Sequence, residues 1–134
     1  MSKVIIFNKR RGGEAARMLL DSFLNKPNWL CHSHEEILNS LSPMERYLSK
    51  QLDLVKIKGK RGRHVPVLLT GQMKAAVTLL CSLREKIEIQ KENKYIFSNG
   101  ANGYIRPWDI LNQMCNSVEL KNPNAINSNN MRKF

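Results

Sequence analysis

The 134-residue sequence lacks a hydrophobic run long enough to cross a membrane. Its N-terminal apolar stretch, residues 4–7, is also too short for the core of a signal peptide. Neither of the glycine motifs GxxxxGK[ST] and GxGxxG occurs, which excludes the common nucleotide-binding loops. Cys31, Cys81 and Cys115 lie far apart without CxxC spacing, so we expect free thiols in a reducing, intracellular compartment and not a disulfide framework.

Acidic residues are scarce as well. Eleven Asp and Glu stand against 22 Lys and Arg, which gives a formal net charge of +11. A field of this sign attracts polyanions, so nucleic acid is the first partner that we expect and an anionic membrane surface the second. The hydrophobic share of 42% is near the globular norm, so we expect one folded domain over residues 1–134.

Hydrophobic spacing predicts a mainly helical fold with a small sheet, of the α+β class. Two glycines between apolar runs at 54–57 and 65–69 predict a hairpin with a longer loop. Ser33 with Glu36 resembles a capping box, Pro43 suits a first helical turn, and Thr70 suits an N-cap. Helices are expected over 14–24, 35–41, 44–52, 71–87 and 106–120, a short strand over 95–97, and a loop with a final helical turn after residue 120.

The predicted hairpin turn carries the densest positive charge of the chain, in the run KIKGKRGR. We expect this turn to lie against a phosphate backbone, although the same run could be a solvated turn or a nuclear-import signal. The signal would place the protein in the nucleus of a eukaryotic cell. The candidate DNA-binding residues are Lys56, Lys60, Arg61 and Arg63, with Lys58 between them.

Phosphoryl transfer without a metal requires cations held around the phosphate and a nucleophile in line with it. Separated cations at the starts of elements are therefore the candidates for such a site. Arg11 precedes a predicted helix, Lys58 or Lys60 lies on the hairpin turn, and Arg132 lies in a predicted helical turn.

Three motifs in this order resemble the catalytic domain of tyrosine recombinases, the phage-integrase family, and especially the copies in animal transposable elements. RGGE at 11–14 is similar to the first-arginine box, KIKGKRGRHVPVLLT to the β-hairpin with its lysine, and NSNNMRKF to the second-arginine box. The resemblance implies the α-rich recombinase fold and a role in DNA recombination or integration. It implies that Arg11 and Arg132 clamp the scissile phosphate and that Lys58, or Lys60, protonates the leaving 5′-hydroxyl, with no metal or cofactor.

The sequence departs from the family pattern at positions where the family has catalytic residues. Asn129 stands where the family usually has a histidine, and Lys133 where another histidine commonly follows the second arginine. The three tyrosines, Tyr47, Tyr95 and Tyr104, all precede the place of the family's nucleophile. The resemblance thus implies an incomplete catalytic domain, which we expect to bind duplex DNA without cleaving it; no enzymatic activity is assigned.

Two other interpretations stay open. The chain could be a basic DNA- or RNA-binding module without recombinase ancestry, or an inert transposon remnant with a marginal fold. The Cys31, His32 and His34 cluster offers too few ligands for a zinc site, because no second Cys or His pair stands nearby, so no metal is expected. The sequence leaves self-association open.

Overall fold

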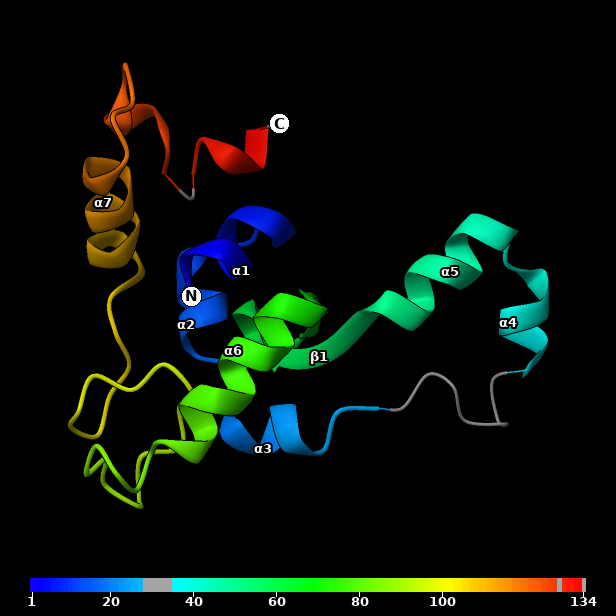
Figure 1. Ribbon diagram of the computed structural model, residues 1–134, viewed down its shortest axis with the longest axis horizontal. Coiled ribbons are helices and arrows are strands. Elements are labelled where there is room, and N and C mark those ends of the chain that lie inside the picture. The colour runs from blue at the N-terminus through cyan, green and yellow to red at the C-terminus, as the bar shows by residue number, and fades with distance from the viewer. Residues whose placement is uncertain (28–34, 128, 134) are drawn as a thin grey trace.

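The structure is a computed structural model that describes residues 1–27, 35–127 and 129–133, without the side chains of Lys60 and Arg132. Its elements form a helical body, a hairpin and an outlying helical pair (Figure 1). This confirms a helical protein with a small antiparallel sheet. The α-helices are α1 Ser2–Asn8, α2 Gly12–Ala16, α3 Leu20–Leu24, α4 Glu35–Ser40, α5 Pro43–Gln51, α6 Gly71–Ser82 and α7 Pro107–Ser117; the strands are β1 Leu52–Lys58 and β2 His64–Thr70; the 3₁₀ turns are η2 Lys60–Gly62, η3 Pro123–Ala125 and η4 Met131–Lys133.

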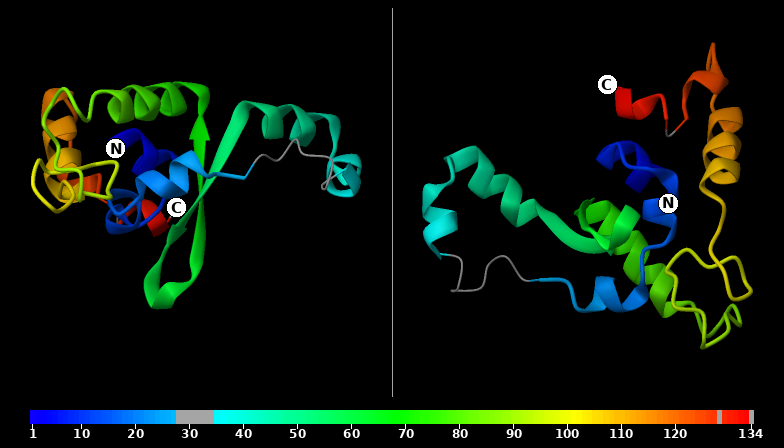
Figure 2. Two further views of the ribbon diagram at one scale, coloured as in Figure 1. Left: turned by 90° about the horizontal axis from the view of Figure 1, so that it is seen from below. Right: turned by 180° about the vertical axis from the view of Figure 1, so that it is seen from behind.

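The hairpin is the predicted feature that the structure reproduces most closely. β1 and β2 pair antiparallel, with Val55 opposite Val67. Val55, Ile57, Val67 and Leu69 are buried on the face toward the helices, as the period of two in a strand requires. The hairpin projects from the helical body with its turn at the far end (Figure 2).

Asn8 joins the first helix to the open edge of β2. Its Nδ2 donates to the Leu68 carbonyl at 2.9 Å, and the Leu68 N–H donates to its Oδ1 at 2.7 Å. The amide side chain thus satisfies both backbone groups of an edge residue, which a neighbouring strand would otherwise do. Helix α1 is thereby fixed against the hairpin.

The prediction of one helix over 14–24 is wrong. The chain forms two short helices, α2 and α3, because the residues between them pair with a distant segment. Leu19 makes an isolated antiparallel bridge with Tyr95, and the Ile96 N–H donates to the Met18 carbonyl at 3.0 Å. This pairing is confined to single bridges, so the predicted strand at 95–97 is absent too. The helices predicted over 71–87 and 106–120 end earlier, at Ser82 and Ser117.

The core lies between the hairpin and the helices of the body. It is contiguous, since its buried residues come from α1, α2, α3, β1, β2, α6 and α7 and from the segment around Ile96. Burial of this apolar surface is the main favourable term in folding. The core residues are Val4, Ile5, Ala15, Met18, Phe23, Val55, Ile57, Val67, Leu69, Val77, Ile96, Phe97 and Leu111.

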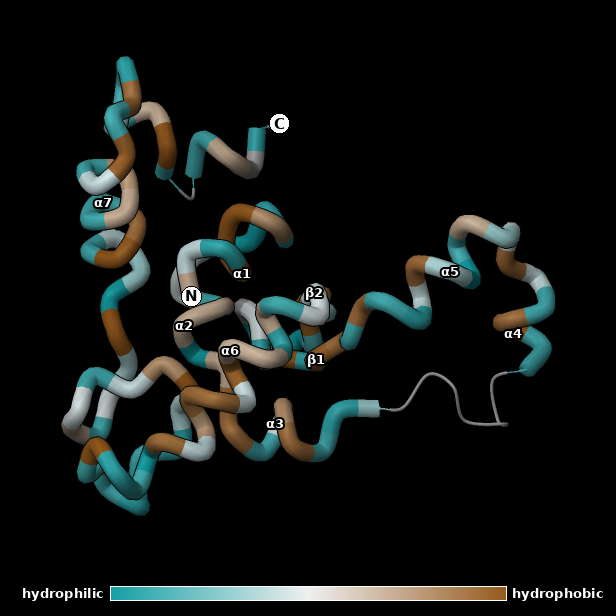
Figure 3. Tube along the Cα trace, in the orientation of Figure 1, coloured by the Kyte–Doolittle hydropathy of each residue, from teal (hydrophilic) through white to brown (hydrophobic). Residues whose placement is uncertain are grey.

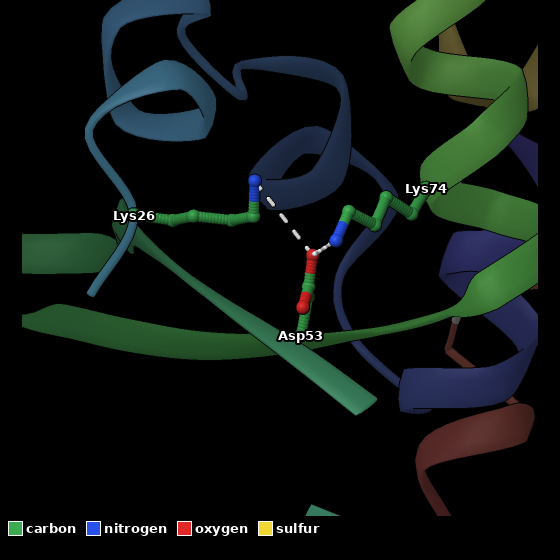
Figure 4. A network of polar contacts seen from close by, with 3 residues as sticks. All are labelled: Lys26, Asp53 and Lys74. Atoms are coloured by element: carbon green, nitrogen blue, oxygen red, sulfur yellow. Dashed lines mark ion pairs between the residues drawn. The ribbon is translucent and has the colours of Figure 1, made fainter. Parts of the chain in front are cut away.

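Asp53 links three elements at the base of the hairpin (Figure 4). Its Oδ2 lies 3.0 Å from Lys74 Nζ on α6 and 3.7 Å from Lys26 Nζ after α3. This oxygen is buried, yet neither ammonium is aligned for a directed hydrogen bond, so the contacts are Coulombic. The negative charge of the carboxylate offsets the repulsion between these two ammonium groups.

Helix α5 begins with a capping box. The Ser42 Oγ accepts from the Glu45 N–H at 3.3 Å, and the Ser42 N–H donates to Glu45 Oε2 at 2.9 Å. The Ser33–Glu36 box expected for the preceding helix includes a residue that lies outside the described part of the chain. Thr70 caps α6 as predicted, because its Oγ1 accepts from the Met73 N–H.

The Ser42 cap makes the first turn of α5 sensitive to acid. The Ser42 hydroxyl, and then its N–H, hold the pKa of Glu45 below its usual value. A lowered folded-state pKa gives stabilisation that is present above the unfolded pKa of about 4.3 and is lost as the pH falls through the folded pKa. We expect the protection factors of the α5 amides, corrected for the intrinsic exchange rate at each pH, to fall below about pH 4. Hydrogen exchange measured by NMR tests this, and a Glu45→Gln variant should show no such acid step.

Within the described ranges, no helix is both long and apolar enough to cross a membrane.

Candidate nucleic-acid interface

Three consecutive cations occupy the turn between α1 and α2. Lys9 ends α1 in the left-handed conformation, with φ 48° and ψ 35°, and its N–H bonds to the Ile6 carbonyl. Arg11 is the N-cap residue of α2 in an extended conformation. The left-handed residue reverses the chain within one position. Lys9, Arg10 and Arg11 therefore sit on a tight turn that two helices hold in place.

The hairpin tip, residues 59–63, is a second tight turn with positive charge. Arg61 and Gly62 both have positive φ, 61° and 73°, and the Gly59 N–H donates to the Arg63 carbonyl at 2.8 Å. Gly59 is required by space, because a Cβ there would lie 2.4 Å from Val65 Cγ2. The same Cβ position is 3.6 Å from Glu14 Oε1. The Glu14 carboxylate of α2 thus reaches Gly59, where the tip begins.

The two turns meet around one hollow of about 370 Å³. We call this the cationic hollow. Its wall contains five cations and a single carboxylate, which belongs to the nearly buried Glu14. The lining residues are Lys9, Arg10, Arg11, Glu14, Arg61, Arg63 and Val65.

The composition of the cationic hollow favours an oxyanion ligand. Arginine presents a planar fork of donors that matches the oxygens of phosphate, and it stays charged at any physiological pH. Five cations around one carboxylate leave an excess of four positive charges in the wall. A phosphate would relieve the repulsion between these groups, so the hollow can bind and orient a phosphodiester.

The structure brings together only part of the residues expected from the sequence. Arg11, Arg61 and Arg63 line the cationic hollow. Lys56 and Lys58 do not, because they alternate with the buried Val55 and Ile57 and so lie on the opposite, exposed face of β1. The candidate general acid Lys58 therefore stands outside the hollow in this arrangement.

Three further predicted residues can be placed only by their backbone or their surroundings. The side chains of Lys60, in η2, and of Arg132, in η4, lie outside the described part of the structure. Met131, next to Arg132, packs against the core, so η4 returns to the body of the protein. Asn129 is exposed in the preceding turn, and its N–H donates to Asn127 Oδ1 at 3.1 Å.

Sequence reasoning missed Lys9 and Arg10 as members of the site. Both belong to the run KRR directly before Gly12, which was the available signal. Spacing alone does not reveal that Lys9 adopts a left-handed conformation and turns the run toward the hairpin tip.

None of the three tyrosines of the chain lines the cationic hollow. Tyr47 lies on α5, outside the body, and is 61% exposed. Tyr95 and Tyr104 pack edge to face against each other, with ring centroids 5.1 Å apart. No phenol is therefore placed to attack a phosphate held in the hollow.

A metal centre has no support in the described residues, where no three His, Cys, Asp or Glu side chains come together. The Cys31, His32 and His34 cluster lies outside the described residues.

Comparisons of the chain with protein-family models, with curated proteins and with solved structures found no match. The resemblance to tyrosine recombinases thus depends on the three motifs alone and stays a prediction.

Proposed function

We propose that the chain binds the phosphate backbone of duplex DNA through the cationic hollow, as a DNA-binding fragment of a tyrosine recombinase-like protein. One observation carries the proposal. The turn at residues 9–11 and the hairpin tip, far apart in the sequence, meet in one concave, cation-lined surface. Contacts of this kind position a protein on DNA and supply most of its affinity without reading the sequence of bases.

The hairpin extends the positive surface beyond the hollow. Lys56 and Lys58 project from the exposed face of β1, on the strand that leads to the tip. Successive phosphates along a DNA strand are several ångströms apart, so five cations divided between two turns suit a backbone better than a single small anion. In this arrangement the cations of the hollow contact successive phosphates of one strand, and the two lysines, on the opposite face of β1, add to the positive field around the hairpin.

The proposed activity is binding without strand cleavage. Guanidinium groups stabilise the charge of a bound phosphate, but cleavage by this family requires an attacking phenol, and none lines the hollow. Recombination or integration would then belong to a protein that supplies the missing nucleophile. This chain supplies phosphate recognition.

RNA is the second candidate ligand. The wall of the hollow is mostly cationic, and cations attract the phosphates of DNA and RNA alike, so the described geometry does not itself select DNA. A basic module without recombinase ancestry would have the same hollow. Competition between duplex DNA, single-stranded DNA and duplex RNA of one sequence distinguishes the two candidates.

The test is the salt dependence of duplex binding, measured by fluorescence anisotropy. Contacts from the five cations of the hollow should give a linear plot of log affinity against log salt with a slope of about −3 to −5. No binding at about 50 mM salt, or a slope near zero, would reject the proposal. As a control, the same complexes on a nicked duplex should leave no protein attached to DNA after denaturing electrophoresis.

A further inference from the structure

Helices α4 and α5 form an arm, residues 35–51, that stands away from the rest of the protein. Neither helix contains a buried residue. Figures 1 and 2 show the arm extending from the hairpin base, with open space between it and the helical body. Packing against the core therefore does not explain the apolar residues of these two helices.

The arm exposes large apolar side chains. Ile37, Met44 and Tyr47 are 54%, 67% and 61% exposed, and Leu48 is 45% exposed. Figure 3 shows hydrophobic residues recurring along both arm helices. Apolar side chains gathered on one surface commonly mark an interaction site, whereas scattered ones need no explanation.

A groove of about 340 Å³ lies at the base of the arm, where α5 meets the outer face of the hairpin. Its wall is mostly leucine, so the same region holds both protruding apolar side chains and an apolar recess. The lining residues are Leu41, Glu45, Leu48, Ser49, Leu52, Leu54 and Leu68.

The distribution of charge indicates which kind of partner suits the arm and its groove. The arm has three carboxylates, Glu35, Glu36 and Glu45, against the two cations Arg46 and Lys50, a net charge of −1. The remaining residues carry a net charge of +12, which together with the arm gives the chain's total of +11. Two copies repel each other over most of their surfaces but not at their arms, while the same near-neutral surface offers a polyanion little attraction.

We propose that the arm is a self-association element that takes a second copy of this chain. In a two-fold dimer, the apolar side chains of each arm enter the leucine groove of the other copy. Such an exchange is reciprocal and closes after two copies, because donor and recess belong to the same region. The capping box of α5 favours the helical form of the arm before this contact, because it satisfies two backbone N–H groups at the start of the helix.

The dependence on salt separates this interface from nucleic-acid binding. Each copy carries +11, and salt screens the repulsion between the copies, so dimerisation through an apolar contact should strengthen as salt rises. DNA binding at the cationic hollow weakens under the same change. Dimerisation through the arm and DNA binding at the cationic hollow can therefore be tested and rejected independently.

Sedimentation velocity of the full chain over a wide range of concentration and salt is the experiment. We expect a monomer–dimer equilibrium, and a Met44→Ser/Tyr47→Ser variant should raise the dimer dissociation constant by about tenfold or more. The single substitution Met44→Glu, at a 67% exposed position, should have the same direction of effect. The matched control is Leu79→Ser, which removes a 59% exposed apolar side chain from α6, outside the arm, and should leave the dimer unchanged.

Three results would overturn the proposal. The first is a monomer at every concentration and salt, which would leave the arm to a different protein. The second is a dimer that the arm substitutions do not weaken. The third is an equal loss of dimer in the Leu79→Ser control. Circular dichroism of each variant shows whether its helices are retained, so a folding defect is separated from the loss of an interface.

Discussion

Replacing Arg11, Arg61 and Arg63 together with glutamine is expected to lower the affinity for duplex DNA by about a thousandfold at about 0.1 M salt. These three guanidinium groups belong to the two turns that meet in the cationic hollow. Each cation that neutralises a phosphate contributes about 0.9 to the slope of log affinity against log salt, so the slope should flatten by about 2 to 3. Fluorescence anisotropy at several salt concentrations measures both quantities.

The matched control removes the same charge from elsewhere. Lys86, Lys91 and Lys121 are exposed and do not line the hollow, and their replacement with glutamine leaves the same net charge. If both triple variants lose affinity and slope equally, DNA is attracted only by the overall charge, and the cationic hollow is not a site. A loss confined to the arginine variant would instead place a phosphate among those three residues.

The features of the fold that the sequence predicted are those set by local chemistry. The hairpin follows from alternating apolar residues and from glycine at the turn. The start of α6 follows from Thr70, whose hydroxyl can satisfy a free backbone N–H, and the start of α5 from Ser42 and Pro43. Each signal and the structure it produces lie within a few residues of each other.

The features that the sequence did not predict depend on partners distant in the chain. Residues 14–24 have helical spacing, yet the helix is interrupted because Leu19 pairs with Tyr95. Nothing near Leu19 encodes that partner. The composition of residues 95–97 predicts a strand, but Tyr95 makes only an isolated bridge with Leu19. Ile96 and Phe97 belong to the core.

The sequence predicted several residues of the candidate site but not how they are arranged. Arg11 and the arginines of the hairpin tip were chosen from their positions at the starts and turns of elements, and these do line the cationic hollow. Strand periodicity already contained the information that Lys56 and Lys58 face away from Val55 and Ile57. Lys58 is a candidate only through the family resemblance, which takes no account of this periodicity.

Asn93 is a residue at which one substitution should cost much of the stability of the fold. Its side chain is 2% exposed, and the two hydrogens of its Nδ2 are shared among three acceptors, Ser98 Oγ at 2.9 Å, the Gly103 carbonyl at 2.8 Å and the Ala101 carbonyl. Its Oδ1 accepts from the Tyr95 N–H at 2.9 Å. One amide group thus organises the whole connection between residues 93 and 103.

Asn93→Asp should reduce the free energy of unfolding by about 3 to 5 kcal/mol at pH 7. The substitution replaces two donor hydrogens with a charged acceptor that faces carbonyl oxygens in a buried position. Arg84, which donates to the Tyr95 and Asn93 carbonyls, keeps its positive charge, so it lessens this penalty but does not replace the two lost donors. Because typical domains are stable by about 5 to 15 kcal/mol, the loss would be a large share of the total.

Acidity should partly restore this variant. Burial among acceptors is expected to raise the pKa of the new carboxyl above its unfolded value of about 3.9. The neutral acid can donate one hydrogen bond, so the variant is least destabilised below that value and loses stability as the pH rises through the folded pKa. The control is Asn99→Asp, because Asn99 Oδ1 only accepts, from the N–H groups of Ala101 and Gly103, and a carboxylate does the same. Urea denaturation at pH 7 and at about pH 4 measures each variant. An equal effect of the two substitutions, or an Asn93→Asp penalty independent of pH, would show that the donors of Asn93 do not hold this connection together.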